Sequence, residues 1–565
     1  MISIKEKIEK LLNRALKEFK WDFSNAQVEH PADLTMGDYS SNVALSAAKK
    51  LATSPRELAE KIVEKLNQEK SKEIEKIEVA GAGFINFFLS QDFFASQAST
   101  ILKLKKNWGD NKNLKKQKII IEYTSPNPFK EFHVGHLVNN IVGESVSRLI
   151  NAEGARVKRV SYHGDVGLHV AKAIWGMQKN TLNQDIMSDW GRAYALGDTA
   201  YTQDENSKKE ITEINKKVYE KSDTEINKLY GQGREVSLKH FEEIYTRLGS
   251  VFQTNFFESQ AGIIGKKLVE KFLKKGVFEK SDGAVIFPES KSGLHTRVFI
   301  NSEGLPTYEA KDLGLVKLKQ RFFNFKKSIT VTDIEQAEYY KVVTSAIEYV
   351  FPKLKGKVLH LSHGRLRLPE GRMSSRGGNI ISGQSLLDSL KAEVMAKMES
   401  RDIENKDKIA DQIAVAALKY SILKQSLGRN IIFDFEKALS FEGDSGPHLQ
   451  YSAVRAKSIL EKAKQEKISP SKKPTENYKM GELERLLYRF PEVVEKAGKE
   501  KEFAPHTIVS YLIELTSVFN SFYAKEKIVD QANPDSGYKI SLTECFLITM
   551  ERGLDLLGIQ VPAKM

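Results

Sequence analysis

Cysteine is almost absent from this chain of 565 residues, since Cys545 is the only one. A lone cysteine excludes an intrachain disulfide framework and a zinc site built from cysteine thiolates. Cys545 lies in the apolar stretch 543–550, so we expect a buried core residue rather than a reactive thiol. A chain that relies on no disulfide suits a reducing compartment such as the cytoplasm.

Long hydrophobic runs and targeting signals are also lacking. The longest nearly uncharged stretch, 506–524, contains Glu514 and several hydroxyl side chains, and its apolar residues recur at helical spacing. This pattern predicts a packed helix rather than a membrane span. Residues 1–10 mix lysine and glutamate without an apolar core, so we expect neither a signal peptide nor a transit peptide.

The composition is that of a folded, multidomain protein. The chain is 41% hydrophobic and 28% charged, and its length exceeds what a single hydrophobic core usually holds. Lysine and arginine number 87 against 74 acidic residues, which gives a net charge of +13. This excess favours a polyanionic partner, although a solvated basic surface explains it equally well.

Three regions of the chain differ in their hydrophobic pattern. Residues 1–110 combine helical periodicity with a strand–turn–strand pattern at 77–89, which predicts an N-terminal α+β domain. Residues 111–385 contain short apolar strands, interrupted by charged helical sequence over about 175–280. Residues 386–565 are helical almost throughout and predict a C-terminal α-helical bundle. We interpret the lysine-rich segment 102–118 as a linker between domains, with a solvated loop and a tRNA-facing segment as equal alternatives.

The central region begins with a βαβ unit. Ile119–Ile121 is a short apolar run of the kind found in buried parallel strands, a helical pattern follows over 137–149, and Val157–Tyr162 is the next strand. Further short apolar runs lie at 284–287, 298–300, 328–331 and 358–361. Parallel sheets bind ligands beyond the carboxyl ends of their strands, and the loop Thr124–His136 would lie there.

A pair of histidines closes this loop. His133 and His136 flank Gly135 at the predicted helix N-terminus, and Lys130 precedes them. Free amides and the helix dipole favour phosphate at such a position, so the set suits a nucleoside triphosphate. A second His-x-x-His pair, His360 and His363, leaves metal binding as an alternative, but no HExxH motif or nearby acidic ligand supports zinc.

A second candidate loop is strongly basic. Residues 366–380 place arginines and glycines around Ser374 and Ser375. Such a loop can fold over a triphosphate and neutralise the charge that develops on pyrophosphate. Taken alone, it could equally be a solvated basic loop.

Together the two motifs form the two-part signature of class I aminoacyl-tRNA synthetases. Within that class the chain resembles the arginyl-tRNA synthetases along almost its whole length. The segments that carry the resemblance are 37–42 (GDYSSN), 81–87 (GAGFINF), 122–136 (EYTSPNPFKEFHVGH), 163–167 (HGDVG), 305–314 (LPTYEAKDLG), 443–459 (GDSGPHLQYSAVRAKSI) and 553–565 (GLDLLGIQVPAKM).

The resemblance implies a fold and a reaction. A Rossmann-like catalytic domain with a parallel sheet is expected over 111–385, between an N-terminal tRNA-binding domain and a C-terminal anticodon-binding domain. The family ligates L-arginine to tRNA(Arg) through an arginyl-adenylate, with ATP and Mg²⁺ and without a tightly bound metal or organic cofactor. The usual family member is a cytoplasmic monomer with no membrane partner.

The resemblance also implies site residues. Those expected to act in catalysis are His133, His136, Lys130, Ser374 and Arg372. Those expected to bind ATP are His133, Gly135, His136, Met373, Ser374 and Arg376. Those expected to bind arginine are Glu122, Asn127, Tyr308, Asp312 and Gln336, and those expected to bind tRNA are Asn42, Tyr451, Arg455, Tyr523 and Met565.

Two positions depart from the family pattern. Val138 stands where arginine is common after the histidine motif, and Ser375 replaces the second lysine of the class's KMSKS loop. That lysine normally helps pyrophosphate to leave. Family members that lack it often carry a lysine just before the histidine motif, so our hypothesis is that Lys130 takes its role, assisted by Arg372 or Arg376.

Other functions remain open from the sequence alone. A class I synthetase for another amino acid is one, with lysine the closest rival because an acidic pocket needs a cationic substrate. A cysteine enzyme is disfavoured because thiolate zinc ligands are lacking. An inactive, synthetase-like RNA-binding protein is the second alternative, and a small nucleotidylyltransferase, which would not need a large helical C-terminal domain, is the third.

Overall fold

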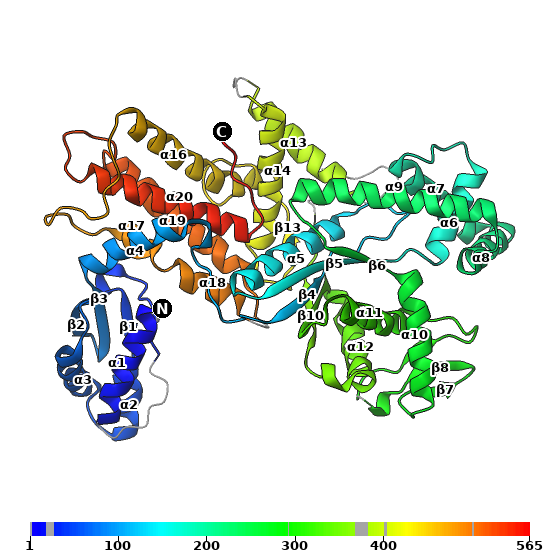
Figure 1. The fold of residues 1–565 in the computed structure, drawn as a ribbon, viewed down its shortest axis with the longest axis horizontal. Helices are drawn as coiled ribbons and strands as arrows, with labels where there is room; N and C mark the ends of the chain where they lie inside the picture. Colours follow the sequence, from blue (N-terminus) through cyan, green and yellow to red (C-terminus); the bar gives the residue numbers. More distant parts are fainter. Residues whose placement is uncertain (1–2, 19–26, 292, 368–381, 400–403, 500–501) are drawn as a thin grey trace. The chain divides into compact units, whose positions relative to one another are not determined.

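The computed structural model describes residues 3–18, 27–291, 293–367, 382–399, 404–499 and 502–565 (Figure 1). The chain divides into two compact units. Unit 1 comprises Met1–Trp108, Arg455–Phe490 and Glu514–Thr549, and unit 2 comprises Gly109–Val454, Pro491–Ile513 and Met550–Met565. The C-terminal helices therefore contribute residues to both units.

The N-terminal part of unit 1 is an antiparallel sheet packed against helices. Its elements are α1 (Ile4–Glu18), β1 (Tyr39–Ser41), α2 (Val43–Leu51), α3 (Pro55–Glu69), β2 (Ile74–Ala80), β3 (Phe84–Leu89) and α4 (Gln91–Leu104). The strand order is β1-β3-β2, and Ile77 pairs with Phe87 in the hairpin that the sequence predicts. Ile8, Leu12 and Phe87 are buried in one core, so the apolar stripe of α1 covers the sheet.

The C-terminal part of the chain is helical, as the sequence predicts. Its helices are α16 (Gly446–Gln465), α17 (Glu482–Leu487), α18 (Phe490–Gly498), α19 (Pro505–Lys525) and α20 (Ser536–Leu556). Within unit 1, Phe519 of α19 stacks on Phe546 of α20 with ring centroids 3.7 Å apart. Cys545 is buried, as predicted, and its thiol donates to the carbonyl oxygen of Ala98.

The centre of unit 2 is a five-stranded parallel sheet. Its strands are β4 (Lys118–Glu122), β5 (Arg156–His163), β6 (Thr254–Phe257), β10 (Lys327–Asp333) and β11 (Val358–His363), in the order β11-β10-β4-β5-β6. The predicted βαβ unit is β4, α5 (Val134–Ala152) and β5. Strand β6 was not expected, because it lies inside the charged, otherwise helical sequence over about 175–280. The predicted Rossmann-like architecture is confirmed.

Two of the predicted strands belong to a different sheet. The runs at 284–287 and 298–300 form β8 (Ala284–Phe287) and β9 (Arg297–Ile300), which pair antiparallel with β7 (Glu279–Ser281) in a separate sheet. A further short pair is β12 (Leu366–Arg367) with β13 (Ile431–Ile432). An apolar run predicts a strand but carries no information about its partner, which explains the difference.

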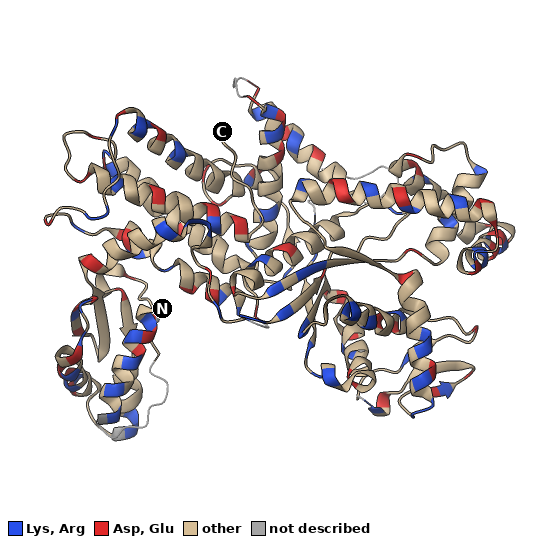
Figure 2. Ribbon diagram, viewed as in Figure 1, with Lys and Arg blue, Asp and Glu red and all other residues tan. Residues whose placement is uncertain are grey.

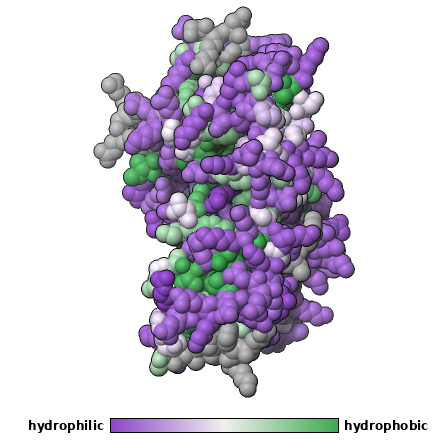
Figure 3. All heavy atoms as spheres, turned by 90° about the vertical axis from the view of Figure 1, so that its left-hand side faces the viewer, coloured by the Kyte–Doolittle hydropathy of each residue, from purple (hydrophilic) through white to green (hydrophobic). Residues whose placement is uncertain are grey.

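The remaining helices of unit 2 surround these sheets. They are α6 (Leu168–Lys179), α7 (Met187–Gln203), α8 (Glu205–Glu220), α9 (Thr224–Leu248), α10 (Glu258–Leu273), α11 (Tyr308–Phe323), α12 (Ala337–Val350), α13 (Gly383–Lys397), α14 (Lys406–Leu423) and α15 (Phe435–Ala438). Among the helices of the described ranges, none combines the length and apolar character that crossing a membrane requires. Basic and acidic residues are interspersed along the helices (Figure 2), and the face drawn in Figure 3 is mostly hydrophilic with small apolar patches.

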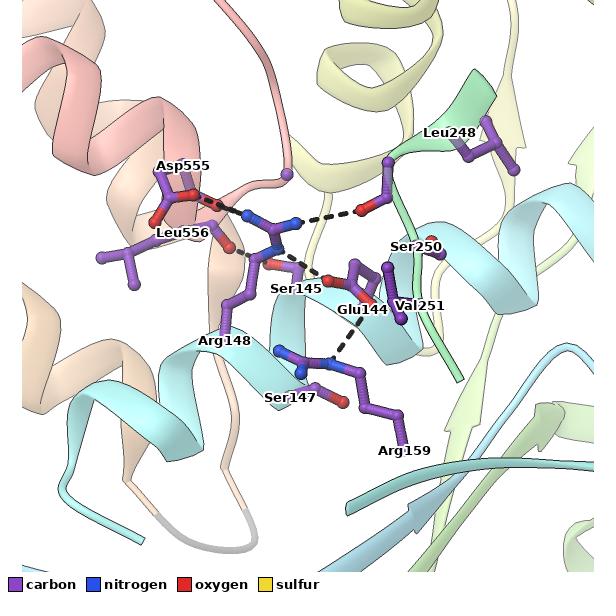
Figure 4. A network of polar contacts seen from close by, with 12 residues as sticks. Glu144, Ser145, Ser147, Arg148, Arg159, Leu248, Ser250, Val251, Asp555 and Leu556 are labelled. Atoms are coloured by element: carbon purple, nitrogen blue, oxygen red, sulfur yellow. Dashed lines mark hydrogen bonds and ion pairs between the residues drawn. The ribbon is translucent and has the colours of Figure 1, made fainter. Parts of the chain in front are cut away.

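A buried polar network anchors the C-terminal half of α5 (Figure 4). The Arg148 guanidinium donates to Glu144 at 2.8 Å, to Asp555 at 2.6 Å and to the carbonyl oxygen of Gly249 at 3.1 Å. Arg159 of β5 approaches the second oxygen of Glu144 at 3.3 Å. The Arg148 guanidinium therefore connects α5, the end of α9 and the last turn of α20.

Lys419 of α14 connects the same segments from another side. Its fully buried ammonium donates to the carbonyl oxygens of Leu248 and Gly558, each at 2.5 Å. Burial lowers the pKa of Lys419 to about 7, and the nearby Arg148 acts in the same direction. The C-terminal segment of unit 2 is thus held by hydrogen bonds from both α5 and α14.

Helices α10 and α11 approach each other closely through two glycines. A Cβ atom at Gly265 of α10 would lie 1.8 Å from the carbonyl oxygen of Ala310, and one at Gly314 of α11 would lie 1.9 Å from that of Ala261. Both distances are far below van der Waals contact, so this crossing excludes any side chain at either position. The pairing is reciprocal and fixes the position of α11.

We expect Gly314→Ala to lower the free energy of unfolding by roughly 1–3 kcal/mol, because the added methyl group must push two backbones apart. The matched control is Gly262→Ala on α10, where a Cβ would lie 3.4 Å from the nearest atom, a Cγ of Pro306. The control should be neutral or stabilising by up to about 1 kcal/mol, since alanine favours helix. Urea unfolding followed by circular dichroism measures both. Equal stability of the two variants would contradict the close approach.

Candidate active site

A pocket of about 810 Å³ opens at the carboxyl ends of the parallel strands. Its wall includes Glu122 at the end of β4, Tyr162 in β5 and Thr332 in β10, together with the first turn of α5. This is the place where a parallel sheet binds its ligands. The loop Thr124–His136, which the sequence analysis placed there, supplies several of the lining residues.

The two histidines lie together at the start of α5. Their rings stack with centroids 3.6 Å apart, and the backbone N–H of His133 donates to Nδ1 of His136 at 3.2 Å. Because Nδ1 of His136 accepts, the neutral ring carries its proton on Nε2 and can donate there. Gly135 lets the ring of His133 fold over the helix, since a Cβ would lie 2.9 Å from its Cε1.

Both imidazoles are neutral near pH 7. Burial moves the pKa of His136 well below its usual value, with a further lowering from His133. Burial also lowers the pKa of His133, and the Lys130 ammonium contributes. Two neutral N–H donors beside free helix amides can bind phosphoryl oxygens without the desolvation cost of burying two cations.

Five acidic residues line the same pocket, and three of them contact lysine or tyrosine side chains. Glu122 forms an ion pair with Lys319, and Glu258 accepts from Lys311 at 2.5 Å. Asp312 accepts instead from the hydroxyl of Tyr339 at 2.7 Å. Both lysines belong to α11, one residue before and seven residues after Asp312, so one helix supplies a carboxylate and two counter-charges.

Asp312 has an unusual protonation equilibrium. Its pKa is raised to about 7, mainly by burial and also by the nearby Glu122 charge, against the opposing effect of the hydrogen bond from Tyr339. A carboxyl group that is half ionised near neutral pH lacks a full counter-charge in the free protein. A cationic ligand would supply that charge.

Asn127, Tyr308 and Gln336 complete the predicted amino-acid site. All three line the pocket. The Asn127 Oδ1 accepts from the backbone N–H of Gly164 at 3.2 Å, so its amide group offers two Nδ2 hydrogens as donors. Tyr308 is 65% exposed at the start of α11, with the Lys311 ammonium 5.0 Å from its ring centroid. The five predicted arginine-binding residues therefore lie around one cavity.

Several lining residues were not predicted. Glu258 follows the unexpected strand β6, and Tyr339 and Tyr340 lie in the first turn of α12. Tyr340 stacks on His360 at 4.4 Å, and Nε2 of His360 lies 2.7 Å from the hydroxyl of Thr332. This packing occupies His360 and gives the second His-x-x-His pair a structural role. The sequence signal that could have revealed Tyr339 and Tyr340 is a cluster of aromatic residues shortly after an apolar strand.

Some predicted residues lie elsewhere. Lys130 is not among the lining residues, and its ammonium lies 4.3 Å from the ring centroid of Tyr194 in α7. The basic loop, with Arg372, Met373, Ser374, Ser375 and Arg376, lies outside the described residues. Its predicted contact with ATP therefore stays a prediction.

The predicted tRNA-binding residues are distributed over both units. In unit 1, the Arg455 guanidinium donates to Asn520 at 2.7 Å and lies 5.4 Å from the ring centroid of Tyr523, which is 46% exposed. Also in unit 1, Asn42 lines a pocket of about 450 Å³ with Met36 and Phe84, both partly exposed. In unit 2, Tyr451 lies on α16 and Met565 is the last residue.

Comparisons with known families match almost the whole chain. Residues 3–89 match the arginyl tRNA synthetase N-terminal domain, residues 97–435 the catalytic domain of class I tRNA synthetases (R), and residues 449–565 the DALR anticodon-binding domain. The three matched ranges follow the order of the expected domains.

Individual relatives agree with these matches. An arginine–tRNA ligase of Treponema denticola is 30% identical over 94% of this chain and 93% of its own, and one of Borreliella burgdorferi is 29% identical over the full length of both. Among solved structures, Thermus thermophilus arginyl-tRNA synthetase covers both chains fully with a TM-score of 0.79 at 24% identity, and the Plasmodium falciparum enzyme gives 0.77 at 21%.

The structural likeness establishes a shared fold, and the family matches extend over more than half of the chain. This chain belongs to the arginyl-tRNA synthetase family of class I aminoacyl-tRNA synthetases.

Proposed function

We propose that this protein is an arginine–tRNA ligase, which activates L-arginine with ATP and transfers it from the adenylate to tRNA(Arg), releasing pyrophosphate and AMP. The observation that supports this best is the pocket itself, which His133 and His136 line together with Glu122, Glu258 and Asp312. A triphosphate and a cationic amino acid would meet between them.

Arginine recognition follows from the charges of the pocket. Glu122 and Glu258 are each neutralised by a lysine of α11, so Asp312 remains the carboxylate whose counter-charge the substrate supplies. A guanidinium is always charged and pairs with carboxylates in a planar fork. Tyr308, Glu122 and Asp312 are our proposed guanidinium site, and Asn127 with Gln336 our proposed site for the α-amino and carboxylate groups.

Activation needs no enzyme nucleophile. The substrate carboxylate attacks the α-phosphorus of ATP, the new P–O bond forms, and the bond to the β-phosphate oxygen breaks as pyrophosphate leaves. His133 and His136 would donate to phosphoryl oxygens as negative charge increases there, which is worth roughly 2–4 kcal/mol for one such donor. Arg372, Met373, Ser374 and Arg376 are proposed to contact the triphosphate.

Lys130 is our proposed substitute for the missing second lysine of the basic loop. Its ammonium rests on Tyr194, which holds it by a cation–π contact near the loop that ends at His133. Rotation of its flexible side chain would bring the charge toward the phosphates. Mg²⁺ is proposed to enter with ATP, since no group of three or more histidine, cysteine or acidic residues in the described ranges could hold the ion alone.

The tRNA is proposed to contact both units. Arg455 and Tyr523 offer a guanidinium and an exposed aromatic ring side by side, which suits a phosphate or an unstacked base. Tyr451 and Met565 are proposed to act with them, and Asn42 to contact the tRNA elbow from its own pocket. A monomeric state and a cytoplasmic location complete the proposal.

ATP–pyrophosphate exchange with each of the twenty amino acids, with and without total tRNA, tests this function. We expect exchange with arginine alone among the amino acids, because carboxylates line the pocket and a guanidinium pairs with them in a planar fork. Exchange only after addition of tRNA would show that tRNA completes the site. Exchange with lysine in place of arginine would contradict the proposed guanidinium site, and tRNA binding without any exchange would favour an inactive RNA-binding protein.

The KM for arginine should depend on pH through Asp312. Because the pKa of Asp312 is about 7, acidification protonates its carboxylate in the free enzyme, and arginine must displace that proton in order to bind. KM should therefore rise as pH falls below about 7, approaching tenfold per pH unit. Tyr339→Phe removes a hydrogen bond that favours the carboxylate, so the rise should begin at higher pH.

The control for this profile is Tyr349→Phe. Tyr349 lies on the same helix, and its hydroxyl donates to the carbonyl oxygen of Lys291 rather than to a carboxyl group. It should keep the wild-type profile. Identical profiles for the wild type and Tyr339→Phe would show that Asp312 does not set the pH dependence.

The Glu122–Lys319 pair should be needed for stability as well as for binding. Both side chains are almost fully buried, so Lys319→Met leaves an unpaired carboxylate and should cost roughly 3–5 kcal/mol of unfolding free energy in urea. The double variant Lys319→Met/Glu122→Gln should regain most of this loss. Lys341→Met removes an exposed pair with Glu338 and should change stability little. If Lys319→Met lost no more unfolding free energy than Lys341→Met, the buried ion pair would be refuted.

A further inference from the structure

The chain makes a strained turn between two parts of the proposed arginine site. Thr124 has a φ of 71°, and the backbone N–H of Ser125 donates to the carbonyl oxygen of Tyr123 at 3.0 Å. A bond across three residues with this φ is the rare, strained form of the γ-turn. Ser125 also has a positive φ, at 46°. For a β-branched residue such as threonine this backbone conformation is unfavourable.

The turn lies between residues that face the same ligand. Glu122 precedes Thr124 by two residues, Asn127 follows it by three, and Thr124 and Ser125 themselves line the pocket. Strand β4 fixes Glu122, while the side-chain Oδ1 of Asn127 accepts a hydrogen bond from the backbone N–H of Gly164. The direction in which the chain leaves Thr124 therefore sets how Glu122 and Asn127 are placed relative to each other.

Two adjacent amides of α5 hold the turn. Oδ1 of Asn139 accepts from the backbone N–H of Thr124 at 2.7 Å, and Nδ2 of Asn140 donates to the Thr124 hydroxyl at 2.9 Å. Thr124 is thus bound through both its backbone and its side chain. Both contacts are buried, where a hydrogen bond is strong and an orphaned partner is costly.

The same amides connect the turn to two other segments. Nδ2 of Asn139 donates to the carbonyl oxygen of Val331 in β10 at 2.8 Å, and Oδ1 of Asn140 accepts from the Ser250 hydroxyl at 2.7 Å. The amides lie directly after the helical turn that holds His136. The strained turn, strand β10 and the histidine helix are therefore joined by two neighbouring side chains.

We propose that Asn139 and Asn140 are positioning residues of the amino-acid site, which hold Thr124 in its strained conformation and thereby align Glu122 with Asn127. This inference rests on the proposed function, because it assigns both residues to the arginine pocket. Asn139 lines the pocket and Asn140 does not, and neither needs to touch the substrate. Their effect passes through the backbone of the turn.

The test is the KM for arginine in tRNA-supplemented pyrophosphate exchange. Asn139→Ala should raise it about tenfold or more, since a buried hydrogen bond to the turn is lost, while the KM for ATP changes much less. Ser147→Ala is the matched control, because it removes a buried hydrogen bond within α5, to the carbonyl oxygen of Gly143, that does not reach the turn. The control should keep the wild-type KM for arginine.

Rescue by glycine separates positioning from general stability. Glycine adopts a positive φ without strain, so the KM for arginine of Asn139→Ala/Thr124→Gly should recover at least half of the loss seen in Asn139→Ala, on a logarithmic scale. A merely structural role of Asn139 gives no reason for rescue. The parallel pair Asn140→Ala and Asn140→Ala/Thr124→Gly repeats the test if Asn139→Ala does not fold.

Each outcome decides a separate question. A raised KM for arginine that Thr124→Gly restores supports the proposal. An Asn139→Ala enzyme equal to Ser147→Ala, or a double variant no better than the single one, overturns it while the proposed function stands. A wild-type enzyme without exchange on arginine contradicts the proposed function instead.

Discussion

Burying carboxylates beside a ligand that is always positively charged is the constraint on which this site depends. Ionised groups taken out of water must be paired or hydrogen-bonded, otherwise they protonate or destabilise the fold. The pocket meets this requirement unequally, with lysine partners for Glu122 and Glu258 and only a tyrosine hydroxyl for Asp312. The unequal pairing leaves Asp312 as the carboxyl group whose ionisation a bound cation would favour.

The fold supplies those partners from one helix. Lys311, Asp312 and Lys319 all belong to α11, so the position of α11 sets the charge balance of the pocket. The close crossing with α10 through Gly265 and Gly314 holds α11 at a distance that no larger residue allows. Packing between two helices thus determines an electrostatic property of the site. A shift of α11 would move the carboxylate and both counter-charges at once.

Motifs local in sequence could be predicted, and contacts distant in sequence could not. The histidine motif, strands β4 and β5 and the residues after β4 are continuous patterns with a direct physical meaning, so they were found. Lys319 looked like one of several exposed basic residues of a helix, and only its burial against Glu122 shows otherwise. Glu258 follows a strand of four residues that is defined by its pairing with β5 rather than by its own sequence. Arg455 and Tyr523 are 68 residues apart and meet only after folding.

Helix α5 combines these requirements because it is buried on all sides. Its first turn presents His133 and His136, its second holds Thr124 through Asn139 and Asn140, and its second half binds the C-terminal segment through Arg148 (Figure 4). A surface helix would spend its polar side chains on water, whereas here each one must find a partner within the protein. Replacing a polar residue of α5 would therefore leave its hydrogen-bond partner on another segment unpaired. Because every buried polar group needs a partner, this one helix contacts the histidine site, the turn at Thr124 and the C-terminal segment of unit 2.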